Sequence, residues 1–175
     1  NTSPDIKIVL VGSLDVFQYQ ASLQTPIRII ANWNEAHIGW NFLDTGLKVK
    51  ELDPRKMSTR QRGEIANRAL YELKNIGKQD KLAVLTGPID KQACSQAGFE
   101  FPGQTEYFAD IWQGDSIMIL AGPKLRVGLA TNHLALKDVA SSITPEVIRK
   151  KITLLSESIS RYLGIDKPKI GVCGL

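Results

Sequence analysis

The sequence predicts an α/β fold, a three-layer sandwich around a mostly parallel sheet with an antiparallel insertion. Short apolar runs alternate along the chain with longer segments in which apolar residues recur at helical spacing. One pair of runs, at residues 116–121 and 125–130, is joined by a short turn at Gly122 and Pro123, which is typical of a hairpin. The other strands are therefore expected to be parallel and to be connected through helices.

Strands are expected where a short run is rich in Ile, Val and Leu. The run at residues 6–12 is closed by Gly12, and residues 47–52 alternate apolar and polar side chains, as in a strand with one wet face. Residues 32–43 have no clear period and are expected to form an irregular surface segment. The expected strands are residues 6–12, 27–30, 47–52, 82–85, 116–121, 125–130 and 169–174.

Helices are expected where capping residues precede an apolar stripe. Ser58 is a helix cap before such a stripe, and Gly77 is a stop signal. Thr144 and Pro145 open a second long helix that ends at Gly164. The expected helices are residues 15–23 (after a possible cap at Ser13), 59–76, 91–97 before Gly98, 105–112 and 145–163.

The composition indicates a globular, cytoplasmic protein of 175 residues with one domain or slightly more. The net charge is +4, and the basic residues are scattered without interleaved aromatic residues, so we expect no nucleic-acid partner. The two cysteines, Cys94 and Cys173, are far apart and fit a reducing compartment. No apolar stretch approaches the roughly 20 residues of a membrane span, and no signal peptide is recognisable.

Three groups of polar residues follow predicted strands or open a helix. Asp90 and Lys91 come after residues 82–85, Gln104 and Thr105 lie at a predicted helix start, and His133 follows the strand at 125–130. Ligands of open α/β sheets bind at the carboxyl ends of the strands, and helix N-termini bind anions. Taken singly, each group has a structural interpretation: Asp90 and Thr105 as helix caps, Lys91 as a solvated charge and His133 as an exposed side chain.

Common cofactor motifs are absent from the sequence. There is no G-x-G-x-x-G after a strand, no G-x-x-x-x-G-K-[ST] and no G-x-S-x-G. A catalytic zinc site needs about three protein ligands. The only other histidine, His37, is far from His133 in the sequence.

Read together, five motifs resemble one family in their order and spacing. They are residues 86–91 (TGPIDK), 101–108 (FPGQTEYF), 125–127 (LRV), 131–139 (TNHLALKDV) and 170–175 (IGVCGL). This set resembles the 4-hydroxythreonine-4-phosphate dehydrogenases of pyridoxal phosphate biosynthesis, from about Ser58 to Leu175.

The resemblance implies a fold like that of isocitrate and isopropylmalate dehydrogenases, with two α/β domains and a cleft, and not a Rossmann fold. It implies a homodimer with a shared active site. The enzyme would use NAD and a divalent metal (zinc, magnesium or cobalt) to oxidise 4-phosphohydroxy-L-threonine to a 2-amino-3-oxo acid, which decarboxylates. His133 would be a metal ligand, and Gln104 and Thr105 would contact the substrate. Lys91 is a further candidate for binding the phosphate. No catalytic residue is assigned.

The chain departs from the family in two ways. The family typically has His where this chain has Gln104, which leaves open a sister dehydrogenase for threonate or erythronate phosphate. The family also has a Gly-rich segment before the first strand and two more metal-ligand histidines after the last. We therefore expect a fragment, inactive alone, with residues 1–57 in the first α/β domain and 58–175 a central region continuing into an incomplete second domain. The other alternative is a non-catalytic, truncated binding module.

Overall fold

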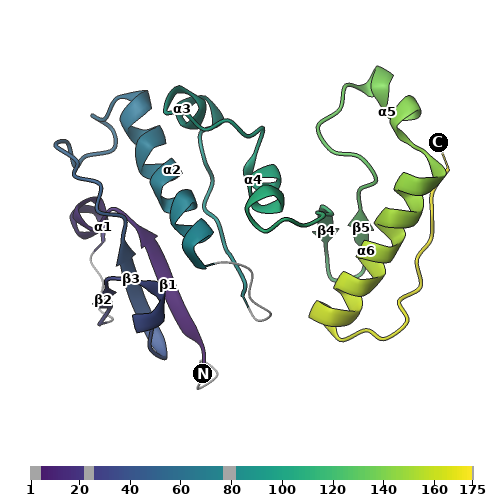
Figure 1. Cartoon of the computed structure of the whole chain (residues 1–175), viewed down its shortest axis with the longest axis horizontal. Coiled ribbons are helices and arrows are strands. Elements are labelled where there is room, and N and C mark those ends of the chain that lie inside the picture. Colours follow the sequence, from purple (N-terminus) through teal and green to yellow (C-terminus); the bar gives the residue numbers. More distant parts are fainter. Residues whose placement is uncertain (1–4, 22–25, 77–81, 175) are drawn as a thin grey trace. The chain divides into compact units, whose positions relative to one another are not determined.

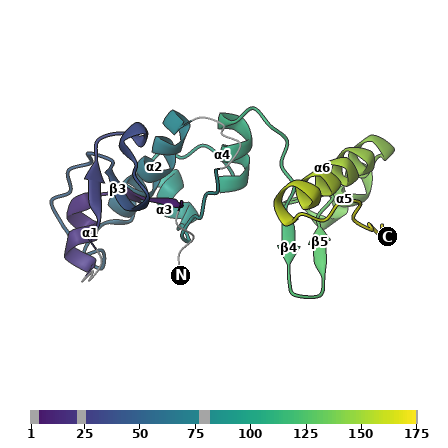
Figure 2. The same ribbon diagram turned by 90° about the horizontal axis from the view of Figure 1, so that it is seen from below.

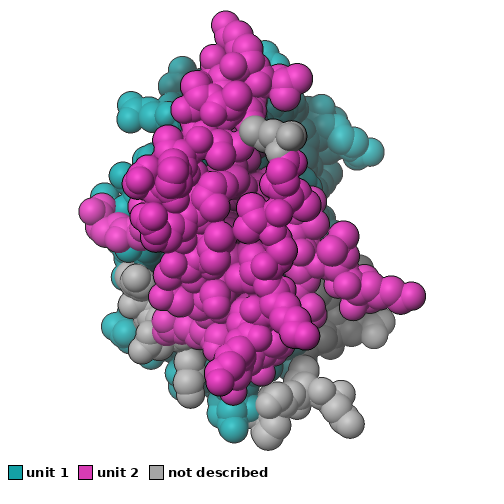
Figure 3. All heavy atoms as spheres, turned by 90° about the vertical axis from the view of Figure 1, so that its right-hand side faces the viewer, with its two compact units in different colours: residues 1–112 teal, residues 113–175 magenta. Residues whose placement is uncertain are grey.

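The computed structural model describes residues 5–21, 26–76 and 82–174. The chain forms two compact units, Asn1–Trp112 and Gln113–Leu175, which Figure 3 distinguishes by colour. The assignment of residues 1–57 and 58–175 to the two domains of a complete enzyme stays a prediction. Among the described helices, none is both long enough and apolar enough to cross a membrane.

The first unit contains a three-stranded parallel sheet. Strand β3 (Gly39–Asp44) lies in the centre, with β1 (Lys7–Gly12) on one side and β2 (Arg28–Ile30) on the other (Figure 1). The predicted strands at residues 6–12 and 27–30 are confirmed, and so is the α/β class.

The central strand contradicts the prediction of an irregular surface segment at residues 32–43. The pattern was obscured by Asn41, a polar residue that is 1% exposed in the middle of the strand. Its side-chain nitrogen donates to the carbonyls of Ile8, His37 and Gly39 at 3.2, 2.8 and 3.1 Å, and its oxygen accepts from the backbone of His37 at 3.1 Å. A buried amide with these partners is well tolerated, although it breaks the apolar pattern.

Three expected strands are not strands. Residues 47–52, 82–85 and 169–174 belong to no sheet, and the prediction for each was wrong. Each has a strand-like composition, but a strand also needs a neighbour to complete its backbone hydrogen bonds. Within the described part of the chain, none of the three has one.

Helices α2 (Thr59–Ile76) and α3 (Lys91–Gln96) begin directly after the expected capping residues, Ser58 and Asp90. Ser58 caps α2 in a reciprocal capping box: its hydroxyl accepts from Gln61 N at 3.2 Å, and the Gln61 side chain accepts from Ser58 N at 2.9 Å. Ser13 occupies the cap position of α1, but its hydroxyl makes no capping bond. Gly77 lies outside the described residues. The helices are α1 (Leu14–Gln20), the 3-10 helix η1 (Trp33–Glu35), α2 (Thr59–Ile76), α3 (Lys91–Gln96) and α4 (Gln104–Ile111).

Helix α2 contacts both α3 and α4 in the first unit. It approaches α3 so closely that a Cβ built on Gly63 would lie 1.9 Å from the carbonyl oxygen of Ala93. Asn67, buried beside it, donates to the carbonyl of Cys94 at 3.0 Å, and Tyr107 of α4 donates to the carbonyl of Leu70 at 3.0 Å. Leu70, Cys94 and Tyr107 form one buried cluster together with Phe99. Burial raises the pKa of the Cys94 thiol and raises that of Tyr107 to about 12.

The second unit consists of a hairpin and two helices. Strands β4 (Ile119–Ala121) and β5 (Arg126–Gly128) are antiparallel, which confirms the predicted hairpin (Figure 2). Helix α5 (Leu136–Ser142) was not expected, whereas α6 (Pro145–Leu163) was.

The signals at both ends of α6 are confirmed. The Thr144 hydroxyl accepts from Val147 N at 3.3 Å, and Gly164 ends the helix in the left-handed conformation with φ of 64°. The hairpin packs on α6, since a Cβ on Gly128 would lie 3.0 Å from a methyl carbon of Leu155.

The turn before α2 is organised by Asp53, which is 5% exposed. Its carboxylate accepts from the backbone N and Nε of Arg55 at 3.1 and 2.9 Å and from Nη2 at 2.9 Å. Its carbonyl accepts from the backbone of Lys56 at 2.9 Å. The hydrogen bonds from Arg55 lower the pKa of Asp53 from 3.8 to about 2.

We predict that Gly63→Ala strongly destabilises the first unit, by about 3 kcal/mol or more, because the added methyl group would overlap the backbone of α3. Gly87→Ala is the control: its Cβ would enter open space, so the change in unfolding free energy should stay within about 1 kcal/mol. Urea unfolding monitored by circular dichroism measures both. Equal stabilities of the two variants would contradict the close contact between α2 and α3.

We predict that Asp53 stabilises the fold above about pH 4 and that this contribution is lost as the pH falls through about 2. The folded carboxyl has the lower pKa, so the unfolded chain binds more protons in this window and stability rises with pH. Urea midpoints of wild type and Asp53→Asn should therefore converge as the pH is lowered. In an Arg55→Ala background the convergence should be smaller, because the guanidinium donors are gone while the backbone N–H of residue 55 remains. An undiminished convergence there would contradict the role of the Arg55 side chain.

Candidate functional site

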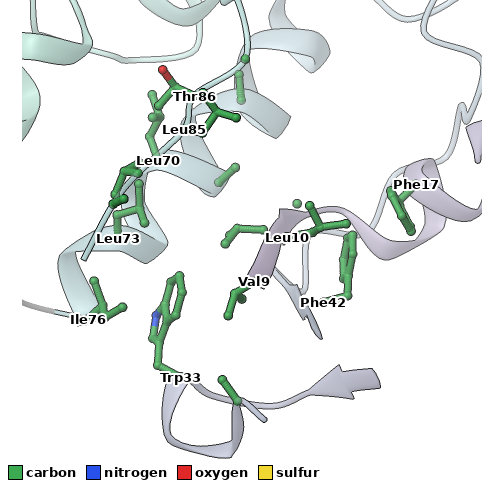
Figure 4. A pocket seen from close by; sticks show the side chains of 18 of the residues that line it. Val9, Leu10, Phe17, Trp33, Phe42, Leu70, Leu73, Ile76, Leu85 and Thr86 are labelled. Carbon is green, nitrogen blue, oxygen red and sulfur yellow. The ribbon is translucent and has the colours of Figure 1, made fainter. Parts of the chain in front are cut away.

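A groove of about 1040 Å³ opens within the first unit between β1, α1, α2 and residues 82–89. In Figure 4 the side chains of Val9 and Trp33 face those of Leu73 and Ile76 on α2 across the opening. The lining contains both apolar and polar residues, and Ser13, Thr86 and Gln104 are among the polar ones. Thr86 and Gln104 come from the first two predicted site segments, so both segments border this groove.

Thr86 and Gln104 connect these two segments directly. The Thr86 hydroxyl donates to the side-chain oxygen of Gln104 at 2.9 Å, across 18 positions of sequence. This bond fixes the amide of Gln104 and directs its two N–H donors away from Thr86. Gln104 is therefore held in one orientation, in which its N–H groups could donate to an anion or a hydroxyl group.

Lys91 lies beside the same helix start. It is the first residue of α3 and is exposed, while Asp90 caps that helix by accepting from Ala93 N at 3.0 Å. A Cβ on Gly103 would lie 4.0 Å from the Lys91 ammonium nitrogen and 3.0 Å from an oxygen of Glu106. The absence of a side chain at Gly103 thus leaves room for both charged groups at the start of α4.

The start of α4 is placed one residue earlier than expected. Gly103 is the N-cap, so Thr105 lies inside the first turn and does not cap the helix. No side chain caps this end, and its backbone N–H groups remain available to an anion. Glu106 in the same turn has a buried carboxylate oxygen without a hydrogen-bond partner among the described residues. The N-terminal end of α4 thus combines backbone N–H donors with the ammonium group of Lys91 and the carboxylate of Glu106.

His133 belongs to the second unit, in the turn between β5 and α5. It is exposed and has a φ of 55°, a left-handed conformation that is uncommon outside glycine. The neighbouring Asn132 has a buried side-chain oxygen that lacks a partner within the described ranges. No group of three or more His, Cys, Asp or Glu residues able to hold a metal occurs among the described residues. His133 is therefore a single potential ligand.

Two hydroxyl groups at the carboxyl ends of the strands were not recognised as site candidates from the sequence. Ser13 follows β1 and Thr45 follows β3, and the side-chain oxygen of each is buried without a partner in the described part of the chain. Ser13 also lines the groove. The signal was a polar residue directly after a buried strand, which at Ser13 was interpreted as a helix cap.

The fold is similar to solved structures of one enzyme. A 4-hydroxythreonine-4-phosphate dehydrogenase from Klebsiella pneumoniae is 21% identical with a TM-score of 0.65, and the match covers 92% of this chain and 52% of that one. The corresponding enzyme from Burkholderia phymatum is 23% identical with a TM-score of 0.69, over 95% and 52% of the two chains. The chain thus spans about half the length of these structures.

The family comparison covers more of the chain than the motifs alone. The matching model is that of the pyridoxal phosphate biosynthetic protein PdxA, and the match extends over residues 5–175. It therefore includes both units and all of the candidate site residues. The chain belongs to the PdxA family.

Proposed function

We propose that this chain is part of an NAD- and divalent-metal-dependent dehydrogenase of 4-phosphohydroxy-L-threonine, acting in pyridoxal phosphate biosynthesis as a homodimer with a shared active site. The family match over residues 5–175 supports this function. The product would be the 2-amino-3-oxo acid, which loses CO₂. NAD would accept the hydride from the secondary alcohol, and the proposal assigns no residues to NAD.

The observation that carries the proposal is the convergence of donors at the start of α4. Lys91 would contribute a compact positive charge, and the first turn of α4 would contribute backbone N–H groups around Thr105. The amide of Gln104, held by Thr86, would donate to an oxygen of the phosphate or of the substrate hydroxyl. Together these groups would bind and orient the phosphorylated end of the substrate.

The described residues do not by themselves fit a metal ion. A catalytic site needs about three protein ligands, and His133 would supply one nitrogen. Under this proposal the remaining ligands come from polypeptide outside the 175 residues, and the isolated chain does not turn over substrate. We therefore derive no catalytic step through a metal from this chain.

Gln104 supports a second candidate function. An imidazole at this position could carry a positive charge, whereas an amide only donates and accepts hydrogen bonds. A site with Gln104 fixed by Thr86 would recognise its ligand at this position by hydrogen bonding and not by an imidazolium charge. This difference keeps another 4-phosphorylated hydroxy acid, such as threonate or erythronate phosphate, as a second candidate substrate. Comparing the two classes of substrate with the complete enzyme would decide between them.

We predict that Lys91→Met weakens the binding of 4-phosphohydroxy-L-threonine to the 175-residue chain about tenfold, because one charge-assisted contact to phosphate is lost. The control is Lys74→Met, which removes an exposed lysine near the end of α2 and leaves the net charge equal to that of the test variant. Isothermal titration calorimetry measures both affinities. Equal weakening by the two substitutions would show only a general charge effect and would contradict the phosphate site.

We predict that Gln104→His makes ligand binding pH-dependent. The imidazole would be protonated below about pH 6.5, so affinity for the phosphorylated ligand should rise as the pH falls through that value. The phosphate itself titrates nearby, so the quantity to compare is the ratio of variant to wild-type affinity at each pH. A ratio that does not change with pH would place residue 104 away from the bound anion.

A further inference from the structure

Strand β1 is an edge strand within the described residues, because β3 is its only sheet neighbour. The carbonyls of Ile6 and Gly12 accept from Gly39 N and Thr45 N, each at 2.9 Å, so the even-numbered residues of β1 face β3. Successive backbone groups of a strand point to opposite edges. The backbone groups of Val9 and Val11 therefore point away from β3, and no strand among the described residues pairs with them.

Residues 82–89 present a second unpaired backbone. The backbone groups of this segment make no hydrogen bond to another described residue. Its side chains alternate in burial: Leu82, Val84 and Thr86 are half-buried, whereas Ala83 and Leu85 are exposed. This period of two is that of a strand, although the segment lies in no sheet. Leu85 is 100% exposed, an unusual state for a large apolar side chain in a strand-like segment.

Both unpaired backbones border the same groove. Val9, Val11 and Leu85 line it, together with Phe17 of α1 and Leu73 of α2. Figure 1 shows residues 82–89 running in the same direction as β1. The groove is therefore bordered by two strand edges of equal direction and by apolar side chains from two helices. A polypeptide segment that fills the groove must offer backbone donors and acceptors to both strand edges, and it must carry apolar side chains on both of its faces.

We propose that this groove is the docking site of one extended β-strand, apolar on both faces and supplied by polypeptide outside the 175 residues. Six residues of β1 set its length at about six residues. Strands covered on both faces read as continuous runs of Val, Ile and Leu, which defines the chemistry of the occupant. The chain spans about half the length of the solved structures, so such polypeptide exists in proteins of this fold.

The docked strand would join residues 82–89 to the sheet. It would accept and donate hydrogen bonds at Val9 and Val11 on one side and at residues 82–86 on the other, and it would cover Leu85. This inference concerns the completion of the sheet and does not depend on the proposed dehydrogenase function.

The test uses the 175-residue chain and a synthetic peptide of about six alternating Val and Ile residues between flanking lysines. Binding is measured by fluorescence anisotropy of the labelled peptide, and the contact site by amide hydrogen exchange. We expect slower exchange at Val9, Val11 and residues 82–86 on binding. A matched peptide with proline at alternate positions lacks the backbone donors of one edge and should bind at least tenfold more weakly.

Two variants locate the binding site. Leu85→Lys places a charge against the groove and should weaken binding about tenfold or more. Ile29→Lys is the matched control, since Ile29 is an exposed apolar residue of β2, at the opposite edge of the sheet. It should leave the affinity unchanged. Protection at β2 with sensitivity to Ile29→Lys, no difference between the two peptides, or no binding at all would each overturn the proposal.

Discussion

The contact between α2 and α3 at Gly63 is the constraint on which the first unit depends. Backbone meets backbone there, and a hydrogen atom is the only side chain that the space admits. The close approach brings Asn67 within reach of the α3 carbonyls, and it places α2 where its backbone accepts from Tyr107 on one side and from Trp33, at 3.3 Å, on the other. One helix thereby joins the sheet side of the unit to the helices that carry the candidate site.

The position of the site follows from this packing. Because α3 is fixed against α2, the backbone of Lys91 at its first residue is fixed as well, and Tyr107 holds α4 so that Gln104 reaches Thr86. The resulting arrangement costs one buried carboxylate oxygen of Glu106 that lacks a partner within the described residues.

Local signals in the sequence predicted the helices well, because caps are local interactions. Ser58 with Gln61, and Thr144 with Gly164, act over a few residues and occur as expected. The sheet was harder, because strand pairing is not local. Asn41 concealed the central strand, since its partners come from β1 and from the preceding turn.

In the candidate site, too, local features could be predicted from the sequence and contacts between distant segments could not. The positions of Lys91 and His133 after predicted strands were visible in the sequence. The strand predicted at residues 82–85, however, pairs with no other described strand. The bond between Thr86 and Gln104 and the buried hydroxyl of Ser13 were not visible, because both depend on packing between distant segments.

The burial of Cys94 has a consequence for chemical labelling. Its thiol is 1% exposed and has a raised pKa, whereas Cys173 in the second unit is exposed. Alkylating reagents attack the thiolate, so they should modify Cys173 directly and reach Cys94 only when α2 and α3 separate. The slow phase of alkylation would therefore report the opening of the first unit's core, and the fast phase would supply an internal standard in the same molecule.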